Sequence, residues 1–239
     1  MSTLVFDIQT IGERWDEIDS VTQNELTKHA DRTARSEAER MSRRAVLRSE
    51  LGLSPCTGFI GSVAVYDLER DQGAVYYCGD GTGREVTRQN VIFKERDEQT
   101  LLEDFWAGAR SYTRFVTFRG RVFDVPFLVH RSIAHGVEPT RDLCRRRYLF
   151  QQQVPYHIDL FDELSFHNAM TRWSSLHMFC RLYDIPSPYS EVSGADITDL
   201  YYRGQYDTIA HHNVATVTAT VALYHRWLAY LAPASFSGS

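Results

Sequence analysis

Apolar residues near the start of the chain form a strand pattern that two polar residues interrupt on one face. Residues 4–10 read LVFDIQT, with Asp7 and Gln9 two positions apart among apolar neighbours. Side chains two apart on a strand point to the same face, so Asp7 and Gln9 are predicted to project together. Such a pair is one way in which a sheet presents oxygen ligands to a divalent cation. Gln9 has the shape of Glu without its negative charge, and it stands where a second carboxylate would be expected.

The pattern then changes from a long hydrophilic stretch to two strands. Residues 13–51 carry mixed charges and few helix breakers, which predicts one or two exposed helices. Residues 58–67 and 74–78 are rich in β-branched and aromatic residues, and turn-forming residues join them. These two segments therefore predict a β-hairpin.

The second half of the chain mixes helical and strand patterns. Apolar residues at helical spacing predict a helix over 97–110, and apolar segments predict strands over 113–118 and 156–159. Antiparallel strands followed by strand and helix units imply an α/β fold in which helices flank a mixed sheet.

The length of 239 residues suits a single domain with a well-buried core. We expect this domain to span residues 1–232, with residues 13–51 as a helical insertion after the first strand. Residues 233–239, PASFSGS, are predicted to form a flexible tail.

Composition places the chain among ordinary globular proteins and predicts a cytoplasmic location. Its hydrophobic content is 43%, and no run is long and apolar enough to span a bilayer or to act as a signal peptide. The four cysteines are scattered without metal-ligand spacing, which is typical of thiols in a reducing compartment. The net charge of −5 means that any nucleic-acid binding must come from a local basic patch.

Two further segments carry candidate chemistry. The loop at residues 79–83, GDGTG, lacks a following Lys-Ser or Lys-Thr, so we interpret it as a surface loop rather than a phosphate cradle. Residues 117–126, TFRGRVFDVP, run from a strand through a turn into a helix. This places Asp124 at a helix start, where it either joins Asp7 across the sheet or caps its helix.

These segments resemble motifs of a known enzyme family. FDIQT at residues 6–10 is similar to Phe-Asp-Ile-Glu-Thr, and residues 117–126 are similar to Thr-Phe-Asn-Gly-Arg-x-Phe-Asp-x-Pro. Both are motifs of the DEDD 3′-to-5′ exonucleases of the ribonuclease-H-like fold, in the branch similar to the proofreading domain of family-B DNA polymerases. The order of later elements, from His157 to Gly204, extends the resemblance over nearly the whole chain. Arg119 departs from it, because the family usually has Asn at that position.

The third motif differs at its expected carboxylate. The family pattern, Tyr-Cys-x-x-Asp-Val-x-x-Thr, corresponds to HNVATVTAT at residues 212–220, so Thr216 stands at the Asp position. His212 occupies the tyrosine-like place, whereas His211 has the spacing of the family's histidine variant. The sequence leaves both histidines as candidates.

The resemblance implies two-metal hydrolysis with Mg²⁺ or Mn²⁺. By resemblance, Asp7 would bridge both ions, Gln9 and Thr216 would complete the water-activating ion, and Asp124 would hold the other. Because Gln9 and Thr216 are neutral, we expect a site that binds one ion weakly or none, and hydrolysis that is reduced or absent. Gln9 by itself also matches a deliberate replacement of Glu by the isosteric Gln, made to trap a complex. Thr216 fits that interpretation less well, because Thr is not isosteric with Asp.

Other side chains are candidates to replace the missing charges. They are the carboxylates Asp159, Asp196, Asp199 and Asp207, and the histidines His211 and His212, which favour a softer metal such as Mn²⁺. We interpret the aspartates as helix caps or surface residues, and His157 with Asp159 as structural.

Basic residues provide a candidate nucleic-acid surface. Arg145, Arg146 and Arg147 precede the aromatic residues Tyr148 and Phe150, a combination that suits phosphate contacts and base stacking on a single strand. A solvated helix end is the alternative and the more common meaning of such a run.

Other arginines and the tryptophans complete the assignment. Arg119 and Arg121 of the second motif join the candidate nucleic-acid contacts, whereas Trp106, Trp173 and Trp227 are expected to pack in the core. Two hypotheses follow. The first is a 3′-to-5′ exonuclease acting on single-stranded DNA or RNA ends. The second is an inactive pseudo-exonuclease that binds nucleic acid or a protein partner, with no membrane association in either case.

Overall fold

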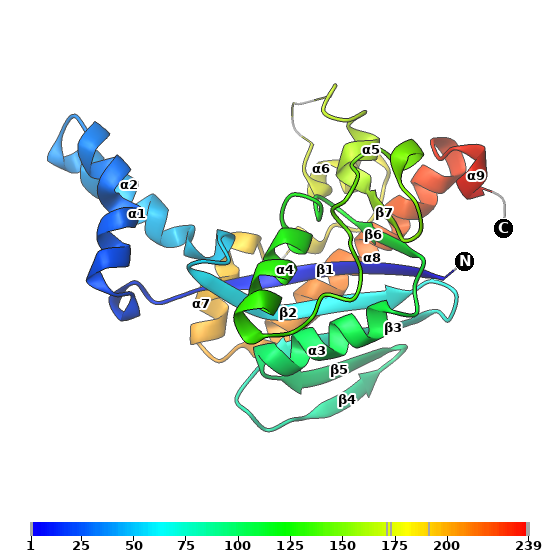
Figure 1. The fold of residues 1–239 in the computed structure, drawn as a ribbon, viewed down its shortest axis with the longest axis horizontal. Coiled ribbons are helices and arrows are strands. Elements are labelled where there is room, and N and C mark those ends of the chain that lie inside the picture. Colours follow the sequence, from blue (N-terminus) through cyan, green and yellow to red (C-terminus); the bar gives the residue numbers. More distant parts are fainter. Residues whose placement is uncertain (1, 171, 173, 191, 238–239) are drawn as a thin grey trace.

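A seven-stranded mixed sheet forms the centre of the molecule (Figure 1). The computed structural model describes residues 2–170, 172, 174–190 and 192–237. The strand order is β4-β5-β3-β2-β1-β6-β7. The strands are β1 (Thr3–Gly12), β2 (Gly58–Asp67), β3 (Gln72–Cys78), β4 (Glu85–Arg88), β5 (Val91–Arg96), β6 (Arg114–Thr117) and β7 (Tyr156–Asp159).

Strand pairing combines both directions. Strand β1 is antiparallel to β2 and parallel to β6, and β6 is in turn parallel to β7. The predicted α/β fold with a mixed sheet is therefore confirmed. The hairpin of β4 and β5 was not predicted, because its residues are largely polar or charged and β4 is an exposed strand at the sheet edge.

Helices cover both faces of the sheet (Figure 1). Helices α3 and α4 lie on one face, and the long helix α8 crosses the other. The α-helices are α1 (Ser20–Thr33), α2 (Glu37–Ser49), α3 (Glu98–Ala109), α4 (Asp124–His135), α5 (Leu160–Leu164), α6 (Leu176–Leu182), α7 (Ile197–Tyr202), α8 (Tyr206–Tyr230) and α9 (Ala234–Ser237). The short 3-10 helices are η1 (Trp15–Glu17), η2 (Leu51–Leu53), η3 (Leu149–Gln151), η4 (Pro188–Ser190) and η5 (Gly194–Asp196). None of the helices in the described residues is both long and apolar enough to span a membrane.

The alternation of β1 divides the core into two layers. Phe6 and Ile8 pack with α3 and α4, whereas Val5 belongs to the cluster under α8. Trp106 is buried in the first layer and Trp227 in the second, as predicted. Trp173 lies outside the described residues. Since Asp7 follows Phe6, it shares the α8 face with Val5.

Helices α1 and α2 form an arm between β1 and β2 that projects from the body (Figure 1). Asp19 and Ser36 cap the two helices through their side chains. At the base of the arm, a Cβ on Gly12 would come within 2.8 Å of the Gly52 backbone nitrogen. The absence of that atom lets η2 pack closely on the end of β1.

The C-terminal segment differs from the predicted flexible tail. Residues 234–237 form the short helix α9, and the Phe236 side chain is only 8% exposed. Its ring packs edge-on against Tyr156 at 5.2 Å and against Trp227 at 6.0 Å. A single apolar residue in a Ser-rich segment carries no periodicity, so the sequence did not reveal this contact.

Candidate active site

Strand β1 places Asp7 and Gln9 side by side under helix α8. Asp7 pairs with Ala64 of β2, and Gln9 pairs with Ser62. The Asn213 side chain of α8 donates a hydrogen bond to the Ser62 hydroxyl at 2.9 Å. This bond holds one turn of α8 over β1 and β2 at the level of Gln9.

Asp124 reaches the same place from the other side of β1. Strand β6 ends at Thr117, and the chain turns at Gly120, where a Cβ would lie 2.4 Å from the Thr117 hydroxyl oxygen. Helix α4 then begins at Asp124, whose Oδ1 accepts the backbone N–H of Ile8 at 3.0 Å. The structure therefore brings together Asp7 and Asp124, which are 117 positions apart in the sequence.

The two carboxyl groups lie in a poorly solvated environment. Burial and the neighbouring Asp124 raise the pKa of Asp7 well above its usual value, although the Gln9 side chain lowers it. Burial also raises the pKa of Asp124 to about 7, despite the backbone N–H of Ile8 that stabilises its charged form. A cation between these groups would favour their ionised forms.

The Gln9 side chain is directed at Asp7. Its Nε2 donates to Asp7 Oδ2 at 2.9 Å. By donating to the carboxylate, the amide occupies a lone pair of Asp7 that could otherwise bind a metal ion. Position 9 therefore competes for Asp7 in place of supplying a second negative charge.

Thr216 lies on the buried face of α8 and is only 3% exposed. Its hydroxyl donates to the carbonyl of His212, one turn earlier in the helix, at 3.1 Å. Such back-bonding is the ordinary behaviour of a buried Thr in a helix. The hydroxyl thus supplies no charge at the position where the resemblance to the third motif predicts a carboxylate.

The two candidate histidines point in different directions. His211 contacts the Arg88 guanidinium and packs at 4.6 Å on Phe93 of β5, which is separated from β1 by β3 and β2. His212 is buried, and its Nε2 has no hydrogen-bond partner among the described residues. Burial lowers the pKa of His212, while a hydrogen bond with the Pro188 backbone raises it. Of the two, only His212 packs against a residue whose pKa is raised by the charges of Asp7 and Asp124.

That residue is Tyr189 of η4, which sequence reasoning missed. Its ring lies 5.7 Å from the His212 ring. Burial and the charges of Asp7 and Asp124 raise the pKa of Tyr189 to about 12. The phenol therefore stays protonated at neutral pH and offers a hydrogen-bond donor close to the carboxyl pair. No motif marks Tyr189, because it reaches the site from a short irregular segment.

The alternative carboxylates are engaged elsewhere. Asp196 accepts hydrogen bonds from Ser193, Asp199 pairs with Arg203, and Asp207 lies 3.8 Å from Arg88. Asp159 accepts the backbone N–H groups of Arg119 and Arg121 at 2.9 and 3.0 Å. Asp159 thus shapes the turn before Asp124, and its charge raises the pKa of Asp124.

His157 has a structural position behind this turn. Its Nδ1 lies 2.7 Å from the carbonyl of Leu143, so it carries the proton, and its Nε2 lies 2.8 Å from the Thr117 hydroxyl. Burial lowers the pKa of His157 to about 3. A neutral imidazole in this position joins β6, β7 and the segment of Leu143 that precedes β7.

Arg119 and Arg121 occupy different environments. Arg119 is exposed, and its guanidinium lies 3.9 Å above the ring of Phe161. The side chain of Arg121 is only 8% exposed and donates to the carbonyls of Leu143 and His157. Burial lowers the pKa of Arg121. Arg121 is therefore a buried link within the protein and is not placed for phosphate contact, in contrast to the sequence prediction.

The segment of Arg145, Arg146 and Arg147 lies on the surface beside β7. Arg147 is bound to Asp162 of α5 through two hydrogen bonds, one of 3.0 Å from its Nε. Arg146 donates to the carbonyl of Gln151 at 3.2 Å, and no partner is recorded for Arg145 in the described part of the chain. Two of the three guanidinium groups thus remain without a carboxylate.

The loop at residues 79–83 folds around a carboxylate of its own chain. Glu95 is 4% exposed and accepts the backbone N–H groups of Gly81, Thr82 and Arg84. Burial raises the pKa of Glu95, but the hydrogen bonds outweigh it and lower the pKa to about 2. The backbone donors that a phosphate would use are therefore already occupied, consistent with a surface loop.

The residues present fit one divalent cation better than two. Asp7 and Asp124 offer two adjacent carboxylates, which is enough for a Mg²⁺ ion that keeps several waters and binds substrate phosphate. Gln9 and Thr216 supply no charge for a second ion. Within the described residues, no group of three or more His, Cys, Asp or Glu side chains is arranged to hold a metal.

Comparison with known proteins bears on the family to which the chain belongs. A family profile described as a predicted 3′-5′ exonuclease related to the exonuclease domain of PolB matches residues 80–234, which include Asp124 and Thr216. No curated protein sequence matches the chain.

The fold also matches that of a solved polymerase structure, the family B DNA polymerase from the hyperthermophilic archaeon Pyrobaculum calidifontis. The TM-score is 0.61 at 14% sequence identity over 95% of this chain. The chain spans 24% of the length of that polymerase, so the likeness concerns the fold of one part of it. Because the family profile covers more than half of the chain, the chain belongs to the family of predicted 3′-5′ exonucleases related to the exonuclease domain of PolB.

Proposed function

We propose that this chain is a 3′-to-5′ exonuclease-type domain that receives single-stranded DNA or RNA ends and has strongly reduced or no phosphodiester hydrolysis. The observation that carries this proposal is the hydrogen bond from the Gln9 amide to Asp7. An exonuclease site needs anionic ligands at this position, and the amide instead occupies one oxygen of the ligand that remains.

The remaining chemistry of the site rests on Asp7 and Asp124. A bound divalent cation would polarise a phosphate oxygen and lower the pKa of a coordinated water. Asp7 and Asp124 would hold such an ion, and the N–H of Ile8 keeps Asp124 in place through its Oδ1. The protonated phenol of Tyr189 adds a hydrogen-bond donor beside the pair.

A second candidate function is a pseudo-exonuclease that binds nucleic acid or a protein partner without any cleavage. One observation favours it. Burial raises the pKa of Asp7 and of Asp124, which favours their uncharged forms, so the site can persist without an ion. Both functions use the same fold, and only a measurement of turnover separates them.

The test compares digestion of 3′-labelled single strands in Mg²⁺ and in Mn²⁺. We expect little or no cleavage by the unaltered protein. The double variant Gln9→Glu, Thr216→Asp restores both carboxylates and is expected to cleave on the order of a hundredfold faster, since metal-ion stabilisation of charge is worth several kcal/mol.

A matched control keeps the net charge of that variant. Thr218 lies on the exposed side of α8, so Gln9→Glu with Thr218→Asp adds the same charges but directs one away from the site. This control should stay as inactive as the single Gln9→Glu variant. Cleavage by the unaltered protein that is as fast as that of the double variant, and that Asp7→Ala abolishes, would contradict reduced hydrolysis; slow cleavage that Asp7→Ala abolishes would exclude the pseudo-exonuclease without any cleavage. An inactive double variant would contradict the assignment of Thr216 to the third motif.

A further inference from the structure

Residues 141–155 form the last part of the connection from α4 to β7, the strand at one edge of the sheet. At the start of this segment Arg141 donates to the carbonyl of Ala109 at 3.3 Å, and near its middle Arg147 is bound to Asp162. Leu149 is buried in the core cluster under α8. The Gln152 side chain exchanges hydrogen bonds with the backbone of His157, at 2.7 and 3.0 Å. The segment is therefore held in place along its length.

On this fixed segment, two aromatic side chains point outward on either side of the buried Leu149. The rings of Tyr148 and Phe150 are stacked, with centroids 5.7 Å apart and an interplanar angle of 24°. Phe150 is 83% exposed and Tyr148 is 37% exposed. The His167 ring meets Tyr148 edge-on at 4.8 Å. We call Tyr148 and Phe150 the aromatic pair.

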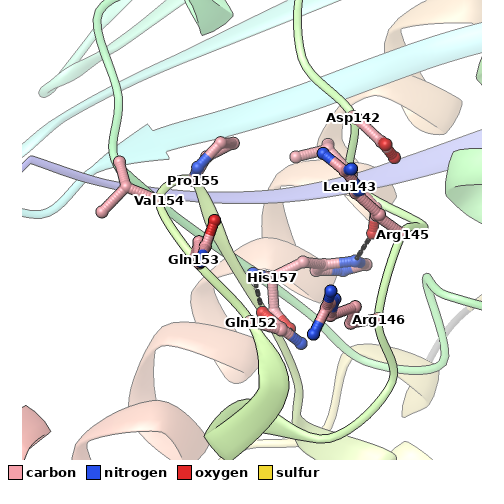
Figure 2. A pocket seen from close by; sticks show the side chains of 9 residues that line it. All are labelled: Asp142, Leu143, Arg145, Arg146, Gln152, Gln153, Val154, Pro155 and His157. Carbon is pink, nitrogen blue, oxygen red and sulfur yellow. Dashed lines mark hydrogen bonds between the residues drawn. The ribbon is translucent and has the colours of Figure 1, made fainter.

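A small polar pocket adjoins the aromatic pair. It has a volume of about 130 Å³ and is lined in part by Arg145, Arg146, Gln152 and Gln153. Figure 2 shows the segment from Asp142 to Arg146 facing the segment from Gln152 to Pro155, with His157 between them. Arg146, which lines the pocket, donates to the carbonyl of Gln151, the residue that directly follows Phe150, so it ties the pocket to the segment that carries the aromatic pair.

The charge of this pocket is set by its arginines. Arg145 and Arg146 have no carboxylate partner among the described residues. The acid lining the pocket, Asp142, accepts the backbone N–H of Cys144 at 3.2 Å. The Gln152 amide is engaged with the backbone of Arg147 and His157, so the surplus of donors comes from the two guanidinium groups and the Gln153 amide, which suits a phosphate group.

Hydrogen bonds of Arg121 connect the pocket to the turn that precedes Asp124. Arg121 lies three residues before Asp124, and its guanidinium donates to the carbonyls of Leu143 and His157, which both line the pocket. Its Nε also lies 3.9 Å from Asp162, the partner of Arg147. Buried Arg121 thus joins the turn that carries Asp124 to the surface that carries the aromatic pair.

We propose that this surface binds single-stranded nucleic acid upstream of the end held at Asp7 and Asp124, with a phosphate at Arg145 and Arg146 and bases stacked on Tyr148 and Phe150. The inference rests on the proposed function, because it assumes that a strand end reaches the carboxyl pair. Stacked aromatic rings beside unpaired guanidinium groups match the requirements of sequence-independent single-strand binding.

Fluorescence anisotropy with two labelled strands tests this surface. Both probes have about 15 positions, one being oligothymidine and the other an abasic strand with the same phosphates, measured in EDTA to prevent cleavage. Tyr148→Ala with Phe150→Ala should weaken binding of oligothymidine about tenfold and leave the abasic strand unchanged, because only the first probe has bases to stack. Arg145→Ala with Arg146→Ala should weaken the binding of both probes. It should also reduce the slope of log affinity against log salt concentration by about two.

The matched control is Tyr230→Ala with Arg226→Ala, an exposed aromatic residue and an exposed arginine on α8. It should bind both probes as the unaltered protein does. Unaltered affinity for oligothymidine in the Tyr148 and Phe150 variant, or an equal loss for both probes, would overturn the proposed stacking surface and leave the proposed function standing. Failure of the unaltered protein to bind either probe would overturn both.

Discussion

At the scale of single residues, the site is defined by what surrounds two carboxyl groups. Asp7 and Asp124 are kept close by one backbone hydrogen bond and are poorly solvated, so both gain a preference for the protonated form. Gln9 reduces that preference for Asp7 by donating a hydrogen bond. The protonation of these two carboxyl groups therefore links the stability of the fold to pH, and the ion of the proposed function would contact the same two groups.

A pH dependence follows from the raised pKa of Asp124. Its folded value of about 7 exceeds the ordinary 3.8, so the folded state binds this proton more tightly than the unfolded state does. The stabilisation is present at low pH and is lost as the pH rises through about 7. Asp124→Asn keeps an acceptor for Ile8 but cannot ionise, so its stability relative to the unaltered protein should increase between about pH 5 and pH 8.

Thermal unfolding at several pH values measures this difference, and millimolar Mg²⁺ supplies a second readout. At the upper pH, Mg²⁺ should raise the Tm of the unaltered protein and not that of Asp124→Asn, because binding to the folded state stabilises it. A pH-independent difference in Tm between the two proteins would show that the environment of Asp124 does not favour its proton.

Arg119 makes a residue-scale prediction about the backbone. Its φ of 63° lies in the left-handed region, where Asn is better tolerated than most residues. Arg119→Asn and Arg119→Gln both remove the contact with Phe161, so their difference isolates the backbone. We expect Asn to be more stable than Gln by about 0.5–1 kcal/mol in urea unfolding. Equal stabilities would contradict the left-handed conformation at this turn.

At the scale of elements, Glu98 fixes the position of α4 against the sheet. Glu98 lies in the first turn of α3 and is 9% exposed. It accepts the backbone N–H of Ile60 in β2 at 2.7 Å, two hydrogen bonds from Arg131 of α4, and one from His135. One carboxylate thus joins α3, α4 and β2, and α4 begins with Asp124.

Removal of this carboxylate should be costly. Glu98→Ala leaves the Arg131 guanidinium and the Ile60 N–H without their partner, and we expect the free energy of unfolding to fall by about 3–5 kcal/mol. Glu85, whose side chain is 49% exposed in its pair with Arg96, is the matched control, and Glu85→Ala should cost less than about 1 kcal/mol. Urea denaturation measures both, and similar losses would contradict the anchoring role of Glu98.

At the scale of the whole molecule, two segments outside the sheet, the arm of α1 and α2 and the tail helix α9, differ in how much of their surface is buried. The arm of α1 and α2 buries only Thr27 and Ala30 within α1 and no residue of α2. The tail helix α9 has four residues, yet Phe236 is buried against Tyr156 and Trp227. The extent of side-chain burial, and not the length of the segment, therefore determines how much each segment contributes to the stability of the fold.

Excision of the arm tests this view. Arg48 lies 4.8 Å above the ring of Trp15, so the two ends of the arm are close and a short Gly-Ser linker can replace residues 20–48. The shortened protein should unfold cooperatively with a Tm within about 5 °C of the unaltered value. Loss of cooperative unfolding, observed by circular dichroism, would show that the arm belongs to the folding unit.

The tail should respond in the opposite way. Phe236→Ala removes a buried aromatic side chain and is expected to lower the free energy of unfolding by about 3 kcal/mol. Ser2→Ala, which alters an exposed hydrogen bond near the other end of the chain, serves as the control. A loss below about 0.5 kcal/mol for Phe236→Ala in urea denaturation would support the flexible tail that the composition predicted.

Much of the fold could be predicted because local patterns encode it. The alternation of residues 4–10 predicted β1 and the shared face of Asp7 and Gln9, and helical spacing predicted α3. The edge strand β4 and its neighbour β5 could not be predicted in this way, since their charged residues are typical of loops. Their pairing, including the parallel pairing of β5 with β3, is a property of the assembled sheet.

The sequence by itself determined the order of most elements, the positions of Asp7 and Asp124, and the neutral residues Gln9 and Thr216, because each is a local property of the chain. Only the tertiary structure decided what those residues contact. It directed Gln9 to Asp7 and turned Thr216 back to its own helix. It also placed Tyr189 beside the carboxyl pair and His211 far from it. The reason is physical: a side chain's partners lie on segments distant in sequence, and their approach depends on packing that no short pattern contains.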